Sequence, residues 1–276
     1  MRLGVSLAVS FSAITGYIVA ASSIDINILY IFLGVFLLSG GASALNQFQE
    51  RNVDALMFRT KSRPIPSKLI SAGLGLFIAI LLCSAGFILL YLKVGTLPAM
   101  LGLLNLIWYN GFYTFLKKKT VFAVVPGSLT GVTPLLIGWS AVNNYLLDPQ
   151  IVFISFFIYM WQIPHFWLLL IKNAEDYKKA GLGTFHQLFS ETQVKRILFA
   201  WIVATSLTSL LLAYFGFIQS QVLFVILIGL NVFISVSFYT ILFRDDHLIK
   251  FKKAFISINA FMIIILMMLI IETLFV

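Results

Sequence analysis

Nine stretches of mostly apolar residues follow one another along this chain, and they constrain its fold more than any other feature. A helix needs roughly 20 apolar residues to cross the hydrocarbon core of a bilayer, whereas the strands of a membrane barrel alternate in polarity over about 10 residues. The sequence therefore predicts an all-α polytopic membrane protein with nine transmembrane helices, forming a single membrane domain over residues 1–276. The predicted spans are residues 3–21, 28–47, 69–92, 96–115, 121–142, 150–171, 197–218, 221–243 and 254–274.

The composition excludes most other classes of protein. Hydrophobic residues make up 61% of the 276 residues and charged residues only 11%, whereas an ordinary soluble domain has about 25% charged residues. So few polar side chains cannot cover a globule that faces water on all sides. A cytosolic enzyme, a disordered protein and a secreted disulfide scaffold are therefore excluded, and the expected surroundings are a lipid bilayer.

The net charge of +9 has a topological explanation. Of the 19 Lys and Arg residues, all but Lys93 lie at the N-terminus or in the second, fourth, sixth and eighth loops between the predicted spans. Cytoplasmic loops of membrane proteins collect Lys and Arg. We therefore expect a cytoplasmic N-terminus, an outside C-terminus and no nucleic-acid partner. The charge pattern would be the same if residues 1–21 were a cleaved signal peptide, but this run is long enough to span and lacks a clear cleavage site.

The acidic residues are concentrated in two connections. Half of the ten lie in the two longest predicted loops, residues 48–68 and 172–196, both on the expected cytoplasmic side. Long loops in compact proteins are often functional. No predicted span has an acid near its midpoint, which argues against a proton relay through the bilayer. The five residues are Glu50, Asp54, Glu175, Asp176 and Glu191.

A polar stripe begins at the first of these loops. Asn46, Glu50 and Asp54 are spaced i, i+4, i+8, so they share one face if the second span continues as a helix. Arg59 and Arg63 follow with the same spacing. Carboxylates followed by arginines suit a metal–polyphosphate complex, because Mg²⁺ takes one or two protein carboxylates plus phosphate oxygens and Arg binds phosphate through two N–H groups. A solvated, salt-bridged helix end is the alternative interpretation.

The second long loop follows a short motif in the sixth predicted span, Trp161 to Trp167. Pro164 can kink this helix and free a carbonyl group. His165 could be a haem ligand or a base, although a buried, hydrogen-bonded histidine is the more frequent case. Lys172 and Asp176 are again spaced i, i+4, and we expect them to face the same cytoplasmic side.

Taken together, these motifs resemble those of the UbiA-type intramembrane prenyltransferases, and within that family the protoheme IX farnesyltransferase (haem O synthase) branch. The resemblance extends over essentially the whole chain, and nine helices are the family's expectation. Glu50 is a departure from the family pattern, in which an Asp is usual at this position. Lys172 stands where many members have an acid, and this lysine favours the haem branch. The matching stretches are Asn46-x-x-x-Glu50-x-x-x-Asp54-x-x-Met57-x-Arg59-Thr60-x-x-Arg63-Pro64, then Tyr113-Thr114-x-Leu116-Lys117-Lys118-Lys119-Thr120 with Gly127, Gly131, Pro134, Gly138 and Trp139, and finally Trp161-Gln-x-Pro164-His165-Phe166 with Lys172 and Asp176-Tyr177-x-x-Ala180-Gly181.

The resemblance implies a Mg²⁺-dependent transfer of a farnesyl group from farnesyl diphosphate to a vinyl group of protohaem (haem B), giving haem O. The residues implied to hold Mg²⁺ on the diphosphate are Asn46, Glu50, Asp54 and Asp176. Cations are implied to balance the diphosphate charge and stabilise it as a leaving group; these are Arg59, Arg63, Lys117 and Lys172. Tyr113 and His165 are implied to line the site.

The resemblance also implies a bacterial cytoplasmic (inner) membrane, with the active site on the cytoplasmic side, and suggests haem A synthase or an oxidase-assembly protein as a further partner. Two other functions fit the same residues. One is a UbiA-type prenyltransferase that acts on an aromatic or quinone-precursor acceptor. The other is a transporter without chemistry, for which broken helices are common. The gathering of polar residues at one side of the membrane, with no ionisable groups at the span centres, argues against the transporter.

Overall fold

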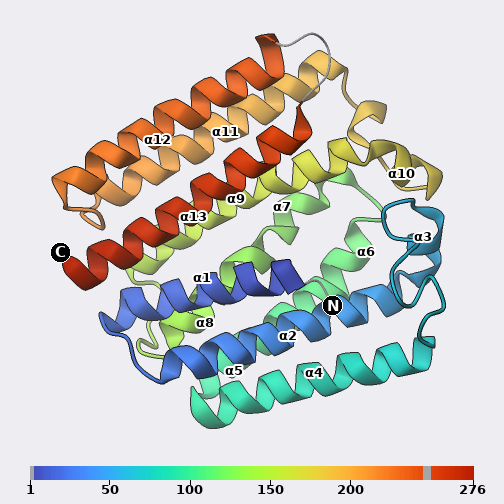
Figure 1. Cartoon of the computed structure of the whole chain (residues 1–276), viewed down its shortest axis with the longest axis horizontal. Coiled ribbons are helices and arrows are strands. Elements are labelled where there is room, and N and C mark those ends of the chain that lie inside the picture. The colour runs from blue at the N-terminus through green and yellow to red at the C-terminus, as the bar shows by residue number, and fades with distance from the viewer. Residues whose placement is uncertain (1–2, 245–249) are drawn as a thin grey trace. The chain divides into compact units, whose positions relative to one another are not determined.

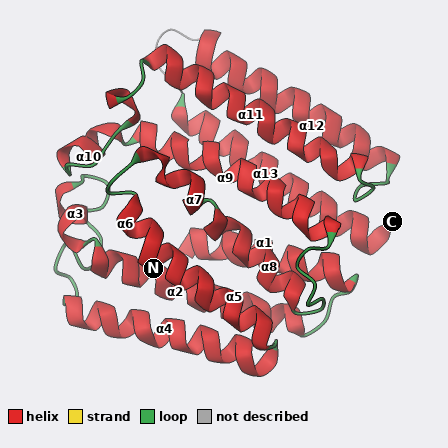
Figure 2. Cartoon of the chain, turned by 180° about the vertical axis from the view of Figure 1, so that it is seen from behind, coloured by secondary structure: helices red, strands yellow, loops and turns green. Residues whose placement is uncertain are grey.

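The computed structural model describes residues 3–244 and 250–276, and each regular element in these ranges is a helix (Figure 2). Eight helical segments are long and apolar enough to cross a membrane. The predicted all-α membrane class is therefore confirmed. The eight segments are Leu3–Ala21, Asn27–Gln49, Ala72–Lys93, Val121–Ser140, Pro149–Lys172, Glu191–Tyr214, Gln221–Arg244 and Phe251–Phe275.

The fourth predicted span, residues 96–115, is helical but not uniform. Helix α5 (Thr96–Leu106) runs into the π-helical segment η1 (Ile107–Tyr113), which is followed by α6 (Thr114–Leu116). No single α-helix in this stretch is long enough to cross the membrane. The described residues therefore contain eight long apolar helical segments where the sequence pattern predicts nine. A membrane span over residues 96–115, the fourth in the predicted order, stays a prediction. π-Helical turns inside helices are frequent at functional sites.

The helices form two compact units. The first comprises Met1–Tyr145 and Asn173–Gly183, and the second comprises Leu146–Lys172 and Thr184–Val276. We describe each unit by itself.

In the first unit, α1 (Leu3–Ala21) packs against α2 (Asn27–Gln49) and α8 (Leu129–Ser140), and α2 packs against α4 (Ala72–Lys93) (Figure 1). Helix α5 packs against α4 and α8. The short elements η2 (Val121–Ala123) and α7 (Val124–Gly127) lead into α8.

Glycines allow two of these helices to approach closely. A Cβ atom on Gly138 of α8 would lie 1.8 Å from the carbonyl oxygen of Ala13 in α1, and a Cβ on Gly16 of α1 would lie 2.1 Å from that of Leu135. Only glycine fits at either position. Close backbone contact is an important source of helix association in lipid, because apolar side chains gain little by leaving lipid tails for one another.

The second unit contains α9 (Pro149–Lys172), α11 (Glu191–Tyr214), α12 (Gln221–Tyr239) and α13 (Phe251–Phe275). Two short elements accompany them, η3 (Phe185–Gln187) and the π-helical η4 (Thr240–Arg244).

Buried hydrogen bonds join the helices of the second unit. Trp161 of α9 donates its Nε1–H to the carbonyl of Ile258 in α13, at 2.7 Å. Asn231 of α12 accepts hydrogen bonds from the hydroxyls of Ser206 and Ser209 in α11. These bonds satisfy polar groups that have no access to water inside a membrane.

Among the eight segments that match predicted spans, the largest difference in boundaries lies at the seventh, residues 197–218. The helix begins at Glu191 and ends at Tyr214. Ser190 and Gln193 form a capping box that starts the helix within a polar stretch, and Gly216 leaves it with a φ of +77°. An apolar run marks the part of a helix that can lie in lipid, whereas capping residues decide where the helix ends.

The two long predicted loops contain short helices. The first holds α3 (Arg51–Leu56), followed by a series of turns up to residue 71. The second holds α10 (Ala174–Lys179) before η3. Both α3 and α10 belong to the first unit, and they carry most of the acidic residues singled out in the sequence.

Candidate active site

Three polar side chains lie along one face where α2 ends and α3 begins. The backbone keeps its helical spacing across the junction: the amide of Glu50 donates to the carbonyl of Asn46 at 2.9 Å, and the amide of Asp54 donates to that of Glu50 at 2.7 Å. Asn46, Glu50 and Asp54 are 4%, 5% and 1% exposed. The predicted shared face is confirmed, and its burial contradicts a solvated helix end. We call these three residues the acidic stripe.

Each carboxylate of the acidic stripe is paired with a cation. Glu50 Oε2 lies 2.6 Å from Lys117 Nζ, and Asp54 Oδ2 lies 2.6 Å from Arg63 Nη1. Within residues 3–244 and 250–276, no other residue hydrogen-bonds the remaining oxygen of either carboxylate. Buried charges need a partner, because desolvation of an unpaired ion is costly. The structure thus places two of the predicted cations directly on two of the predicted metal ligands.

Lys117 comes from the end of the segment formed by η1 and α6. Its Nζ lies 5.6 Å from the centre of the Tyr113 ring, and Thr114 between them accepts a hydrogen bond from Asn46 Nδ2 at 3.1 Å. A Cβ on Gly127 would lie 2.5 Å from the Tyr113 ring, so a larger residue there would have to displace the ring. Thr114 lies within the matching sequence stretch, but the sequence does not predict a role for it. Its polar side chain next to Tyr113 is the one sequence feature that could have pointed to a contact with the site.

Arg63 and Arg59 lie in the turns after α3. Asp176 of α10 organises these turns, since its Oδ1 and Oδ2 accept hydrogen bonds from the backbone amides of Phe58 (3.2 Å) and Arg59 (3.0 Å). Arg59 itself is exposed. Asp176 therefore holds the segment that carries Arg59 and Arg63, and its role as a metal ligand stays a prediction. Over the described part of the chain, no three His, Cys, Asp or Glu side chains group as a metal cluster would.

Lys172 and His165 belong to the second unit. Helix α9 ends at the exposed Lys172, and Asn173 leaves the helical conformation with φ −108° and ψ 23°, so Lys172 and Asp176 do not share one continuous helix. The His165 ring contacts the rings of Trp161 and Phe255, with centroids 4.7 and 4.9 Å away. Its Nδ1 is buried with no hydrogen-bond partner among the described residues.

The donor atoms of the acidic stripe fit a hard divalent cation. Two carboxylates and one carboxamide offer oxygen ligands, and Mg²⁺ commonly uses one or two protein carboxylates with water and phosphate oxygens completing its coordination. Asn46, Glu50 and Asp54 would hold such an ion. Lys117 and Arg63 lie beside them and would attract a phosphate group that accompanies the cation.

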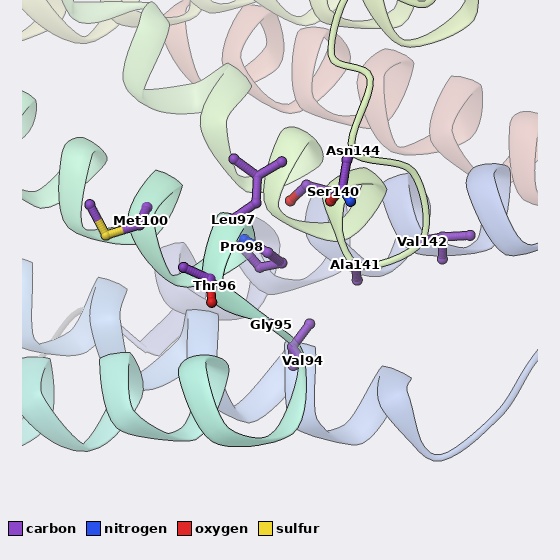
Figure 3. Close-up of a pocket in the computed structure, with 10 residues that line it drawn as sticks. All are labelled: Val94, Gly95, Thr96, Leu97, Pro98, Met100, Ser140, Ala141, Val142 and Asn144. Atoms are coloured by element: carbon purple, nitrogen blue, oxygen red, sulfur yellow. The ribbon is translucent and has the colours of Figure 1, made fainter.

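A hollow at the C-terminal end of α4 lacks such chemistry. It is an open depression of about 650 Å³ between the start of α5 and the end of α8 (Figure 3). Its lining contains no acidic or basic side chain. It is formed by Val94, Gly95, Thr96, Leu97, Pro98, Met100, Ser140, Ala141, Val142 and Asn144.

Known sequences match this chain over most of its length. The model of the UbiA prenyltransferase family matches residues 9–259. Protoheme IX farnesyltransferase of Nitratidesulfovibrio vulgaris (strain DP4) is 30% identical over 275 residues, which cover 99% of this chain and 93% of that protein. Protoheme IX farnesyltransferase of Christiangramia forsetii is 38% identical over 184 residues, covering 66% and 59%.

Solved structures share the fold. The structure of digeranylgeranylglyceryl phosphate synthase has a TM-score of 0.78 at 17% identity and covers 100% of this chain and 96% of that one. The structure of a UbiA homologue from Archaeoglobus fulgidus bound to GPP and Mg²⁺ has a TM-score of 0.73 at 12% identity, with coverage of 99% and 97%. At these identities the likeness establishes the fold.

Proposed function

The chain belongs to the UbiA prenyltransferase family, and we propose that it transfers a farnesyl group from farnesyl diphosphate to a vinyl group of protohaem, giving haem O. Relatives named protoheme IX farnesyltransferase support this donor and this acceptor, one of them at 30% identity over 99% of the chain. The structural observation that carries the proposal is the buried acidic stripe with Lys117 and Arg63 paired to its carboxylates.

The site suits the departure of a diphosphate group. Mg²⁺, when bound, neutralises part of the diphosphate charge and stabilises it as a leaving group. The acidic stripe would hold this ion, with Asp176 as a further ligand from α10. Arg59, Arg63, Lys117 and Lys172 would bind the phosphate oxygens, and Tyr113 and His165 would line the site. Lys117 and Arg63 would exchange their carboxylate partners for phosphate oxygens when substrate enters.

The transfer is a substitution without oxidation or reduction. The bond between the allylic carbon of the farnesyl group and the diphosphate oxygen breaks, and the electron pair leaves with the diphosphate. The vinyl group of protohaem supplies the electron pair for the new carbon–carbon bond. Water then adds to the cation left on the vinyl carbon and loses a proton, which yields the hydroxyethylfarnesyl group.

The proposed setting is a bacterial inner membrane crossed by nine segments, with α5, η1 and α6 together forming the fourth. The N-terminus and the acidic stripe would be cytoplasmic and the C-terminus outside, which the distribution of Lys and Arg supports. Cys83 is the only cysteine of the chain, so single cysteines placed at Ser67 and Asn144 in a Cys83→Ser background test this topology. An impermeant thiol reagent added outside intact cells should label only the cysteine at Asn144.

Purified full-length protein with protohaem, farnesyl diphosphate and Mg²⁺ should form haem O, detected by mass spectrometry. Omission of the diphosphate or chelation of Mg²⁺ should abolish the product. Absence of haem O under conditions in which a known protoheme IX farnesyltransferase works would overturn the proposal. A screen with the same donor tests the acceptor: product on a quinone precursor and none on protohaem would assign the chain to the other branch of the family.

Haem A synthase or an oxidase-assembly protein is the proposed recipient of the product. Co-purification of either protein with the tagged chain from a membrane extract, lost when the tag is placed on an unrelated membrane protein, would support this partner.

A further inference from the structure

A buried hydroxyl group joins the π-helical segment η1 to the acidic stripe. Thr114, which follows η1, has no exposed surface. Its Oγ1 donates to the carbonyl of Tyr109 at 2.9 Å and accepts from Asn46 Nδ2 at 3.1 Å. Threonine hydroxyls in α-helices usually bond the carbonyl three or four residues earlier. Here the π-helical turn places the carbonyl five residues earlier within reach.

The chemistry of these groups decides the direction of both bonds. A hydroxyl has one proton, and the carbonyl of Tyr109 can only accept it, so Thr114 can offer Asn46 only a lone pair. The carboxamide of Asn46 must then turn its NH₂ group toward Thr114 and its Oδ1 away. Within residues 3–244 and 250–276, no hydrogen bond reaches this Oδ1. The amide presents its oxygen, the atom that can bind a cation.

A second contact holds η1 in register with α2. Asn110 of η1 is 4% exposed, and its Nδ2 donates to Gln49 Oε1 at 3.0 Å and to the carbonyl of Ala42 at 3.2 Å. Gln49 Nε2 donates in return to the carbonyl of Asn110 at 3.1 Å. Asn110 precedes Thr114 by four residues, so these reciprocal amide bonds support the Thr114–Asn46 contact from the same helical face.

We propose that Thr114 is a positioning residue that orients the amide oxygen of Asn46 toward the cation of the acidic stripe. Thr114 touches neither substrate nor cation and acts through Asn46. Without its hydroxyl, the carboxamide is free to rotate by half a turn and present an NH₂ group, which cannot bind a cation. The inference rests on the proposed function, since it assigns a cation to the stripe.

The test measures metal binding directly. Thr114→Val removes the hydroxyl and keeps the volume, Thr114→Ala removes it with less crowding, and Thr114→Ser keeps it. Mn²⁺ is the probe, titrated into the full-length protein with inorganic pyrophosphate and followed by electron paramagnetic resonance. We expect Mn²⁺ affinity to fall by about tenfold in Thr114→Val and Thr114→Ala, the lower end of the loss typical for groups that orient a metal ligand, and to stay near wild type in Thr114→Ser.

Asn46→Asp supplies a second test. A carboxylate offers an oxygen whichever way it turns, so Thr114→Val should cost no further Mn²⁺ affinity in the Asn46→Asp background. Thr15→Val is the matched control, because Thr15 is also fully buried and its hydroxyl bonds, among the described residues, only the carbonyl of Phe11 within α1, at 3.1 Å. It should bind Mn²⁺ like the wild type.

Wild-type affinity in the folded Thr114→Val and Thr114→Ala proteins would overturn the inference. So would an equal loss in Thr114→Ser, an equal loss in Thr15→Val, or a wild type that binds no Mn²⁺. If the expected Mn²⁺ pattern appears in a protein that makes no haem O, the proposed reaction fails while the orientation of Asn46 by Thr114 stands.

Discussion

The two ends of helix α2 are held by different kinds of polar contact. At its start, the turn from α1 is closed by near neighbours: the hydroxyl of Tyr17 donates to Asp25 Oδ2 at 2.6 Å, and the amide of Asn27 donates to Asp25 Oδ1 at 2.8 Å. All three residues lie within eleven positions of one another in the chain. This turn needs no distant element to complete its hydrogen bonds.

At its other end, α2 meets partners from distant segments. Asn46 contacts Thr114, 68 residues away, and Glu50 contacts Lys117, 67 residues away. Asn46, Thr114 and Glu50 are buried and Lys117 is half-buried, so the Glu50 carboxylate has lost most of its hydration and depends on its partner. The difference shows that hydrogen bonds between near neighbours suffice to close a turn. The end of α2 where charged side chains from distant segments meet away from water is the end at which substrate chemistry is expected.

The largest expected effect is at Asp54. Asp54→Asn should lower haem O formation and diphosphate release about 100-fold or more, the order of loss seen when one group that stabilises a transition-state charge is removed. Membrane insertion should be unchanged, because the partner Arg63 is partly exposed and can reach water. Asp25→Asn makes the same substitution at the other end of α2 and should keep activity within about twofold. Equal turnover of wild type and Asp54→Asn would refute the role assigned to Asp54.

A smaller effect, on stability, is expected where α1 and α8 touch. Gly138→Ala should reduce the free energy of unfolding by about 1–3 kcal/mol, the usual cost of overpacking, because its Cβ would meet the backbone of Ala13. Thermal unfolding in detergent measures the loss. Gly229→Ala is the control, since a Cβ there meets nothing within 4 Å. Equal melting temperatures of the two variants would contradict the close contact between α1 and α8.

Shortening the Glu50 side chain tests the ion pair with Lys117. Glu50→Asp withdraws the carboxylate by one methylene from Lys117, so we expect about a tenfold fall in haem O formation, comparable to the disturbance of a metal-ligand partner. Glu191→Asp is the control, because the pair that Glu191 forms with Lys195 is local (i, i+4) and Glu191 is 55% exposed. Exposed pairs of this kind contribute little. Full activity of Glu50→Asp would show that the reaction does not depend on the length of the Glu50 side chain.

The smallest effect is expected on acidification at the start of α2. The Tyr17 hydroxyl, which donates to Asp25, lowers the pKa of that carboxyl from its usual value of 3.8. A pKa lowered by folding contributes stability that is present above the unfolded pKa and is lost as the pH falls through the folded pKa. Tyr17→Phe should therefore melt slightly below wild type at pH 6, and the gap should begin to narrow below about pH 3.8 and close as the pH falls through the lowered pKa of Asp25. A gap that does not change with pH would mean that the hydroxyl acts only through packing.

Part of the site follows from the sequence, because helical spacing is a local property. The positions of Asn46, Glu50 and Asp54 predict a shared face without knowledge of any other segment, and the structure confirms that face. Their partners do not follow, since the pairing of Glu50 with Lys117 depends on how α2 packs beside η1 and α6. Asp176 shows the same limit. Its carboxylate accepts hydrogen bonds from the backbone amides of Phe58 and Arg59, and a backbone amide is present at almost every residue, so the sequence cannot predict these partners.

The sequence by itself determined that this chain is a helical membrane protein, because the thickness of the bilayer and the cost of burying polar backbone leave few other ways to fold nine long apolar runs. It also determined which end of the helices collects the charges. Only the tertiary structure decided that the acidic stripe is buried, that Lys117 and Arg63 lie on its carboxylates and that Thr114 orients Asn46. The contacts of Thr114 and Lys117 follow a π-helical turn, and the pattern of apolar residues does not specify the register of the backbone hydrogen bonds that form it. The contact of Arg63 depends on the turns after α3, which Asp176 holds from a segment more than 100 residues away.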